Sequence, residues 1–368
     1  MRNSRLAAAV LCAAAGLVFQ WTIVRANYGG NWTALFCHGS EYPVPAALAS
    51  EHIYVFPGSG GYDGQSYHYV AHDPLNRTGI GRAVPDPARR FPRILVPGLA
   101  YLLALGRQEW IDPALFAVNL MFLGLGAYWL ACLLPRPMWA VGYVLAPVAL
   151  ISLDRMTVDL ALASLALGFA VYARREADRK LWVVMLAAAL CRESGFLLFG
   201  AWAWREAGRG RWRRIPIFAT ALVPAIAWNL ASGAGHFGYP IPFHGILDAI
   251  LHPRSYPFPP SLNAVIQAVG AVQLIGLLLG MGLAFRGLRA AGRDAVWNLC
   301  LLFAVFGICT PPGTYDDPLA GVRILAPLLH FQLIEGGRWG RWPLVLAAPR
   351  AYLELLPQVL RVIGLRVG

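Results

Sequence analysis

Residues 262–286, LNAVIQAVGAVQLIGLLLGMGLAFR, form an apolar run whose only charged residue, Arg286, stands at its last position. A helix of about 20 such residues is long enough to cross the hydrocarbon core of a bilayer. Similar runs recur from residue 6 to about residue 336 with no soluble domain between them. We therefore expect an all-α, polytopic membrane domain over residues 1–340. A C-terminal helix over 341–368 then either spans the membrane or lies along its surface.

The composition of the 368-residue chain favours the same class of protein. Hydrophobic residues make up 58% of it, charged residues 14%, and the mean hydropathy is +0.53, which is too apolar for a chain whose surface must face water. The net charge of +12 comes from short basic clusters between apolar runs, a pattern typical of topology signals and not of nucleic-acid binding. Five of the six cysteines fall within or beside apolar runs, so neither a disulfide framework nor a CxxC zinc site is predicted.

Basic residues in the loops predict an orientation. Arg2 and Arg5 precede the first apolar run, which we expect to be an uncleaved helix entering from the cytoplasm. The segment 26–112 then lies outside as a long first loop with juxtamembrane helices. We expect about ten or eleven helical segments in all, at 6–25, 93–106, 113–133, 138–152, 157–173, 181–204, 215–231, 262–286, 295–310, 322–336 and 342–365.

The segment 181–204 has basic clusters on both sides. Arg174 to Lys180 and Arg205 to Arg214 both read as cytoplasmic loops, and one crossing cannot join two loops on the same side. We therefore expect two half-length helices that meet at the polar turn 192–195, Arg-Glu-Ser-Gly, near the outer face of the membrane. A single span with a buried pair of Arg192 and Glu193 is the alternative.

The first outer loop contains the sequence GSGGYDGQSYHYVAHDP at 58–74, which predicts a glycine turn followed by an aromatic helix. Asp63 would stand at the start of this helix and is the candidate catalytic residue. A carboxylate at the membrane surface, with Gln65 and Tyr67 beside it, can remove a proton from an acceptor hydroxyl. The alternative is that Asp63 only caps the helix N-terminus.

No metal site is expected. His68 and His72 have the i, i+4 spacing of a zinc pair, but only Asp73 stands nearby as a third ligand, so hydrogen-bonding roles are expected for them. Asp154 and Asp159 are five residues apart, about 140° around a helix, which does not make a ready metal site.

Three elements of the chain resemble GT-C integral membrane glycosyltransferases, in particular a bacterial family tied to cell-surface glycopolymer formation. They are Tyr62-Asp63-Gly64-Gln65-x-Tyr67, Arg90-x-x-Arg93-x-x-x-Pro97 and the break Arg192-Glu193-Ser194. Asp63-Gly64 is also similar, more distantly, to the Trp-Asp-Gly element of lipid-anchor mannosyltransferases. The resemblance covers about residues 1–210. It implies a sugar donor linked to polyprenyl phosphate, a glycan acceptor outside the membrane, and inverting transfer with Asp63 as the acidic residue of the first loop.

A polyprenyl phosphate donor needs cations that hold the leaving phosphate. The candidates are Arg90 and Arg93, which three-residue spacing would place on one helix face, together with Arg192 and Arg323. Alternatively, Arg90 and Arg93 contact lipid headgroups, and Arg192 forms a structural ion pair with Glu193 or Asp159. The candidate substrate-binding residues are Tyr62, Gln65, Tyr67, Asp154, Asp159, Glu193 and Tyr315.

The expected protein is thus a glycosyltransferase that works at the periplasmic face of a bacterial cytoplasmic membrane. Its partners would be a polyprenyl-phosphate sugar, a glycan or lipid-linked acceptor and membrane lipid, with no nucleic acid. No cofactor is expected, since the lipid-linked sugar is a substrate. The aromatic, proline-rich outer loop 232–261 would cover the site. Two rival hypotheses are a transporter or flippase for a lipid-linked polysaccharide and a non-catalytic assembly partner.

Overall fold

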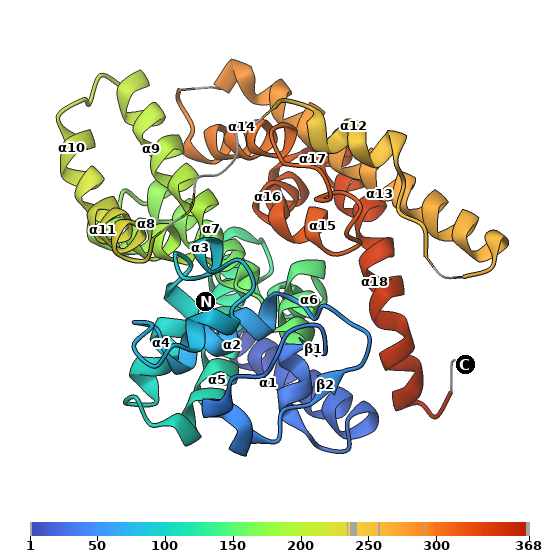
Figure 1. Cartoon of the computed structure of the whole chain (residues 1–368). Helices are drawn as coiled ribbons and strands as arrows, with labels where there is room; N and C mark the ends of the chain where they lie inside the picture. Colours follow the sequence, from blue (N-terminus) through green and yellow to red (C-terminus); the bar gives the residue numbers. More distant parts are fainter. Residues whose placement is uncertain (1, 234, 236–240, 257, 291, 366–368) are drawn as a thin grey trace. The chain divides into compact units, whose positions relative to one another are not determined.

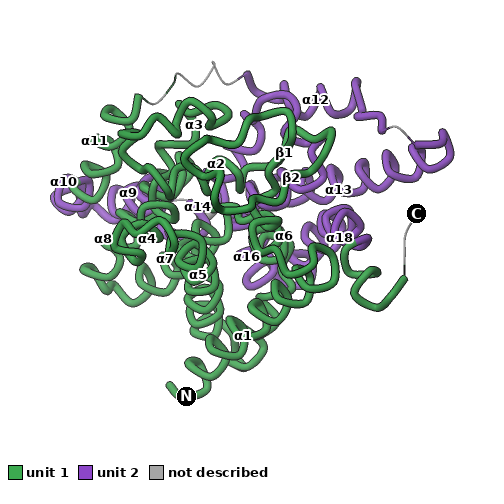
Figure 2. Tube along the Cα trace, turned by 60° about the horizontal axis from the view of Figure 1, so that its bottom comes forward, with its two compact units in different colours: residues 1–196, 220–235, 358–368 green, residues 197–219, 236–357 purple. Residues whose placement is uncertain are grey.

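The computed structural model describes residues 2–233, 235, 241–256, 258–290 and 292–365, and helices dominate them (Figure 1). The strands in this part of the chain, β1 (His38–Gly39) and β2 (Val55–Phe56), form one short parallel pair. The all-α class expected from the apolar runs is therefore confirmed. The chain divides into two compact units, which the sequence pattern did not indicate: unit 1 holds 1–196, 220–235 and 358–368, and unit 2 holds 197–219 and 236–357 (Figure 2).

Four helical segments of the described chain are long and apolar enough to cross a membrane. They are α1 (Arg2–Asn27), Gln108–Leu133, Arg214–Ala231 and α13 (Pro260–Arg286). The expected span 138–152 is instead bent by 50° between η5 (Pro137–Leu145) and α6 (Pro147–Arg155), and counts as a fifth span if the pair is taken together. Pro147 explains the bend, because proline lacks the N–H that would continue the helix.

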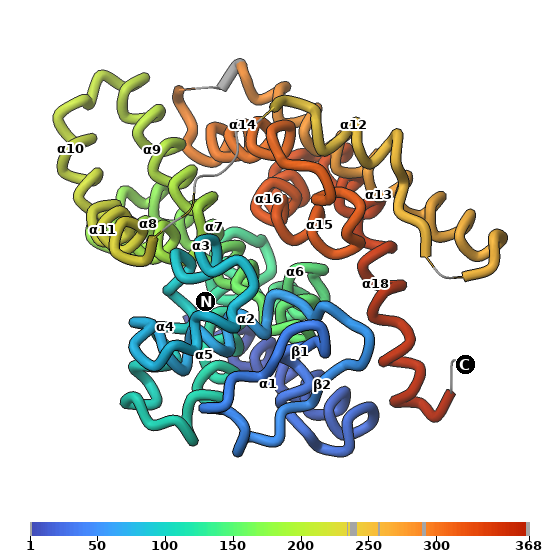
Figure 3. The backbone as a smooth tube through the Cα atoms, in the orientation of Figure 1, coloured from blue at the N-terminus to red at the C-terminus, as the bar shows by residue number. Residues whose placement is uncertain are grey.

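In unit 1, α1 packs against α5 (Ile111–Leu133) and η5, and α5 packs against α7 (Asp159–Arg174) (Figures 1 and 3). Almost all of α7 is buried. Its sequence is rich in Ala, with Ser164 and Gly168 also small, which allows neighbouring helices to approach closely. On its other flank α7 packs against α8 (Asp178–Cys191).

The segment 26–112, predicted to be the first outer loop, is largely structured. It contains η1 (Trp32–Phe36), η2 (Ala46–Glu51), α2 (Asp63–His72), η3 (Ile80–Ala83) and α3 (Pro87–Arg90), and leads through α4 (Leu95–Leu103) and η4 (Gln108–Trp110) into α5. Leu48, Tyr69, Val70, Ile80, Val84 and Phe91 form a hydrophobic cluster inside the loop. This small core fixes α2 against its neighbours, and α2 also packs against α4 and α5.

The helical segment 181–204 is interrupted at the predicted place. Helix α8 ends at Cys191, Arg192 is extended, and the single turn η6 (Glu193–Gly195) follows before α9 (Phe196–Gly208) begins. A side chain at Gly195 would overlap the carbonyl oxygen of Ala188, so glycine permits the turn to fold closely onto the end of α8. Arg192 and Glu193 therefore do not lie inside one continuous helix.

Unit 2 contains α9, α10 (Arg214–Ala219), α12 (His244–Leu251), α13, η8 (Gly287–Ala290), α14 (Ala295–Ile308), α15 (Ala320–Ile324), α16 (Ala326–Glu335), α17 (Gly337–Gly340) and most of α18 (Trp342–Val362). Helix α13 packs against α14 and α16. Between α10 and α12 the chain returns to unit 1 as η7 (Thr220–Leu222) and α11 (Val223–Ala231). Residues 234, 236–240 and 257 of the expected covering loop lie outside the described residues.

Candidate functional site

Asp63 is the first residue of helix α2 and pairs with Arg90. The helix begins where the backbone of Tyr62 is extended, and Tyr62 makes no side-chain capping hydrogen bond. A carboxylate oxygen of Asp63 lies 2.7 Å from Nη2 of Arg90, and both side chains are mostly buried. The N-cap position itself is held by Tyr62, one residue before the position that the alternative prediction gave to the cap. Asp63 lies within the first turn, where its negative charge still suits the helix dipole.

The two residues after Asp63 hold the backbone in place. A side chain at Gly64 would overlap the carbonyl oxygen of Arg155, so glycine is needed where α2 approaches the end of α6. The amide of Gln65 accepts a hydrogen bond from the N–H of Gly39 at 3.1 Å and donates one to the carbonyl of Gly60 at 3.0 Å. Gln65, expected to contact substrate, is instead buried and engaged by the loop backbone.

Tyr67 joins the two arginines of the loop. Its hydroxyl accepts hydrogen bonds from Nη1 of Arg93 at 3.0 Å and Nη1 of Arg90 at 3.4 Å. The expectation that Arg90 and Arg93 share a helix face is wrong, because α3 ends at Arg90 and Arg93 lies in the turn before α4. The two side chains converge through Tyr67, a residue from another helix.

Arg93 connects the loop to the break between α8 and α9, because it pairs with Glu193. Its guanidinium forms a two-pronged pair with Glu193, with Nε to Oε2 at 3.0 Å and Nη2 to Oε1 at 2.8 Å. The same carboxylate accepts from Nε of Arg192 at 3.2 Å, and Nη1 of Arg192 pairs with Asp159 at the start of α7. The structural ion pair considered for Arg192 is thus present with both partners that were named for it.

These contacts form one chain of polar groups within unit 1, which we call the arginine network: Asp63, Arg90, Tyr67, Arg93, Glu193, Arg192 and Asp159. Three guanidinium groups face three carboxyl groups, so a phosphate entering the network must compete with carboxylates for the same donors. Burial alone would raise the pKa of Glu193, but the positive charges of Arg93 and Arg192 outweigh it and lower that pKa to about 2.

Asp154 belongs to a separate pair. It lies at the end of α6, with Oδ2 2.9 Å from Nε of Arg155, and accepts a hydrogen bond from Gln358 at 3.3 Å. The guanidinium of Arg155 lies 5.9 Å from the ring centre of Tyr62. Asp154 and Asp159 therefore stand on different helices, each beside an arginine, and do not face a common point.

Tyr315 and Arg323, the remaining predicted site residues, belong to unit 2. The hydroxyl of Tyr315 donates to the carbonyl of Gly307 at 2.6 Å, which holds the loop before α15 against α14. Arg323 is buried within α15. Unit 2 also buries Arg350, which sequence reasoning did not single out as a site residue; it donates to the carbonyl of Asp316 at 2.9 Å.

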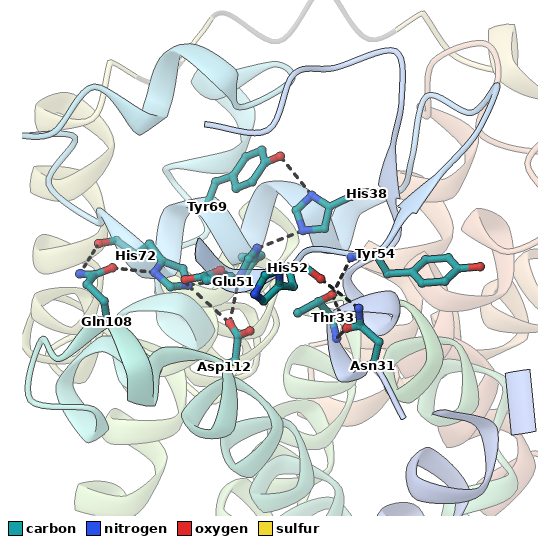
Figure 4. A network of polar contacts seen from close by, with 11 residues as sticks. Asn31, Thr33, His38, Glu51, His52, Tyr54, Tyr69, His72, Gln108 and Asp112 are labelled. Carbon is teal, nitrogen blue, oxygen red and sulfur yellow. Dashed lines mark hydrogen bonds and ion pairs between the residues drawn. The ribbon is translucent and has the colours of Figure 1, made fainter. Parts of the chain in front are cut away.

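A second group of titratable side chains, which we call the histidine cluster, lies on another face of α2. It consists of Glu51, His68, His72 and Asp112, and one nitrogen or oxygen atom from each lies within 4.8 Å of the others. Figure 4 shows Glu51, His72 and Asp112 converging, with Gln108 on the outer side of His72. Asp73, the nearby acid weighed as a possible third ligand, accepts hydrogen bonds from the backbone N–H groups of Arg77 and Thr78.

The histidines of the cluster have further partners. Nδ1 of His72 lies 2.6 Å from Oε1 of Gln108, and Nδ1 of His68 lies 3.0 Å from Nε2 of His38, which in turn contacts the hydroxyl of Tyr69 (Figure 4). Burial alone would lower the pKa of His68, but its carboxylate neighbours outweigh burial and raise that pKa to about 9. Burial and the charge of His68 lower the pKa of His38 to about 2, so His38 stays neutral.

Sequence reasoning found the histidine pair but missed its carboxylates. The i, i+4 spacing of His68 and His72 is a local signal, whereas Asp112 stands 40 residues beyond His72 and Glu51 lies in a separate turn. The available signal for Asp112 was its position as an acid at the start of an apolar run.

Comparison of the chain with protein-family models, with curated proteins and with solved structures finds no match.

Proposed function

We propose that the chain is a GT-C type membrane glycosyltransferase of a bacterial cytoplasmic membrane. It would transfer a sugar from a polyprenyl-phosphate donor to a glycan acceptor on the periplasmic side. The observation that carries the proposal is the arginine network, in which the acid of the first outer loop and three arginines from two distant parts of the sequence join one set of contacts. Four apolar segments suited to crossing a membrane support the membrane setting.

In the proposed reaction the carboxylate of Asp63 accepts the proton of an acceptor hydroxyl. The hydroxyl oxygen then attacks the anomeric carbon of the donor sugar, and the bond from that carbon to the phosphate oxygen breaks with its electron pair leaving on the phosphate. Attack from the opposite face inverts the configuration. Arg90 and Arg93 would stabilise the charge that develops on the phosphate. Arg90 already lies beside Asp63, so the base and the cation occupy neighbouring positions.

In the proposal the other members of the network have supporting roles. Tyr67 orients the two loop arginines through one hydroxyl, and Glu193 fixes the plane of the Arg93 guanidinium through two hydrogen bonds. Arg192, predicted as a phosphate ligand, is engaged by Glu193 and Asp159, so its role in the proposal is to hold Glu193 in position. Asp63, Arg90 and Arg93 remain the residues proposed to contact reacting groups.

The test measures transfer of radiolabelled sugar from a panel of polyprenyl phosphate donors to a periplasmic glycan acceptor. Membranes would hold equal amounts of wild type, Asp63→Asn or Asp86→Asn. Asp86 is a matched control, since it is an exposed acid of the same loop whose side chain pairs with the equally exposed Arg89. Removal of a general base should lower the rate by about 10²–10⁴-fold, whereas Asp86→Asn should transfer like wild type.

A split between kcat and KM separates catalysis from the ion pair. Loss of a base lowers kcat with little change in KM for the donor, whereas a loosened Arg90 would raise that KM. Equal transfer by wild type and Asp63→Asn would remove Asp63 from the mechanism. No transfer by wild type across the donor panel would favour the transporter or assembly-partner hypotheses.

A further inference from the structure

We propose that Glu51, His68, His72 and Asp112 bind one zinc ion. These residues come from three segments of unit 1: the end of η2, helix α2 and the first turn of α5. The site is separate from the arginine network, and its metal content can be measured whether or not the chain transfers a sugar.

The spacing of the four groups fits a tetrahedral zinc site. Zinc bonds to nitrogen and oxygen of about 2.0–2.1 Å imply ligand-to-ligand distances of about 3.3 Å in a tetrahedron. Nε2 of His68 lies 2.8 Å from Asp112, 3.1 Å from Nε2 of His72 and 3.3 Å from Glu51. Nε2 of His72 lies 3.4 Å from Oδ1 of Asp112 and 3.4 Å from Oε1 of Glu51, the other oxygen of that carboxylate. One atom from each of the four residues lies within 4.8 Å of the others, so small side-chain shifts would set them at the corners that the ion requires.

Hydrogen bonds among the four groups account for only part of this arrangement. Nε2 of His68 has three potential acceptors around it, yet an imidazole nitrogen carries at most one hydrogen. Carboxylate oxygens and the second imidazole nitrogen all offer lone pairs towards the same point. A cation at that point satisfies all of them at once, and two carboxylates balance the charge of a divalent ion.

The outer partners also suit a metal site. In protein metal sites the second nitrogen of a ligating histidine usually donates to a fixed acceptor, which selects the tautomer. Nδ1 of His72 faces Oε1 of Gln108 at 2.6 Å, and the Gln108 amide in turn donates to the backbone carbonyl of His72 at 3.3 Å. This leaves Nε2 of His72 free of hydrogen and directed inwards. His68 is held from behind by His38 and stacks on Phe36, with ring centres 4.1 Å apart.

Ligand chemistry selects zinc over the common hard cations. Imidazole nitrogens suit zinc and later transition metals, whereas calcium takes six to eight oxygen ligands and magnesium keeps several waters. Both histidine side chains are fully buried, and the carboxylates are about 20% exposed, which provides an entry side. With four protein ligands the ion would be structural and would fasten α2, which also carries Asp63 and Tyr67, to η2 and α5.

The test uses the full chain purified in detergent with an affinity tag other than polyhistidine, so that nickel columns and tag histidines do not contribute metal. After removal of loosely bound metal, one equivalent of zinc is added, the protein is gel-filtered, and zinc per chain is measured by mass spectrometry. Wild type should retain about one zinc, and His68→Ala and His72→Ala should each retain less than about a tenth as much. His52→Ala is the matched control, because His52 is an exposed histidine next to Glu51 whose backbone carbonyl, which the substitution keeps, accepts a hydrogen bond from Asn31.

Two further measurements keep the proposal open to refutation if an alanine variant fails to fold. Gln108→Ala leaves all four ligands in place and should weaken zinc affinity by about 10–100-fold. Cobalt added to wild type should give the visible absorption of a tetrahedral site, and this band should disappear when zinc is added. Wild type that retains no zinc, or ligand variants that retain as much as wild type and His52→Ala, would overturn the site.

Discussion

Arg93 and Glu193 lie 100 residues apart in the sequence and form a two-pronged ion pair, with N···O distances of 3.0 and 2.8 Å. Arg93 is nearly fully buried, and the Glu193 side chain is 27% exposed. The pair joins the predicted first outer loop to the break between α8 and α9. It therefore fixes the position of two segments that local structure alone would leave independent.

Glu193→Gln should destabilise the protein by about 3 kcal/mol, because it leaves the buried guanidinium groups of Arg93 and Arg192 without their shared carboxylate. The measurement is the thermal unfolding midpoint of the purified chain in detergent. Glu109→Gln, which changes an exposed acid of the same unit, should leave the midpoint unchanged. The double variant Arg93→Gln/Glu193→Gln should lose less than the sum of the two single losses; strict additivity would show that the pair contributes no coupling.

Lowering the pH should remove the stabilisation by the Glu193 carboxylate over a defined range of pH. The pKa of Glu193 is lowered from its ordinary value of 4.5 to about 2, since the charges of Arg93 and Arg192 outweigh the effect of burial. A depressed carboxyl pKa stabilises the folded state above the ordinary value, and this stabilisation is lost as the pH falls towards the folded value. The gap in unfolding midpoint between wild type and Glu193→Gln should therefore stay constant from pH 7 to about pH 5 and narrow between about pH 4.5 and 2. A gap that begins to close near neutral pH would contradict this assignment.

Tyr67→Phe should impair donor use without unfolding the protein. The change removes the hydroxyl that accepts from Arg90 and Arg93 but keeps the buried ring. Under the proposed function, the arginines lose their common anchor, so KM for the polyprenyl-phosphate donor should rise by roughly tenfold, the effect of losing one ordinary hydrogen bond. Steady-state kinetics at varied donor concentration measure this KM. The control is Tyr42→Phe, which changes an exposed tyrosine of the same loop. An unchanged donor KM would show that Tyr67 does not position these arginines for substrate.

Gly64→Ala should destabilise the protein more than the addition of one methyl group would suggest. The added methyl group would overlap the carbonyl oxygen of Arg155, so α2 must move away from the end of α6 and take Asp63 with it. This overpacking should lower the free energy of unfolding by about 1–3 kcal/mol, and sugar transfer should fall as well. Gly142→Ala is the control, because a methyl group there meets no neighbouring atom. Equal unfolding midpoints for the two variants would show that the close approach at Gly64 is not required.

Thiol labelling tests the predicted orientation of the loops. Ala49→Cys places an exposed cysteine in the predicted first outer loop, and Arg211→Cys places one in a predicted cytoplasmic loop. The native cysteines of the described chain are buried or half-buried, so background labelling should be low. A membrane-impermeant maleimide should label the first variant in intact spheroplasts and the second only after permeabilisation. The reverse pattern would invert the topology and place the arginine network on the cytoplasmic side.

The sequence by itself determined the features that depend on short-range patterns. Apolar runs predict the all-α class, because a buried backbone in lipid must satisfy its hydrogen bonds within each segment. The glycine turn before Asp63 predicts the start of α2, and the polar residues at 192–195 predict the break after Cys191. Each of these follows from neighbours along the chain.

Only the tertiary structure decided which side chains meet. Arg90 and Arg93 converge on Tyr67 although they do not share a helix face, and Glu193 reaches Arg93 across 100 residues. Glu51 and Asp112 complete the histidine cluster through packing of η2 and α5 around α2, a result that the spacing of His68 and His72 does not contain. Gln65 likewise has a side chain that could bind a ligand. In the folded chain it is buried, and its amide forms hydrogen bonds with the backbone instead. Side-chain partners depend on contacts between segments distant in sequence, and such contacts leave no periodic signal in the chain.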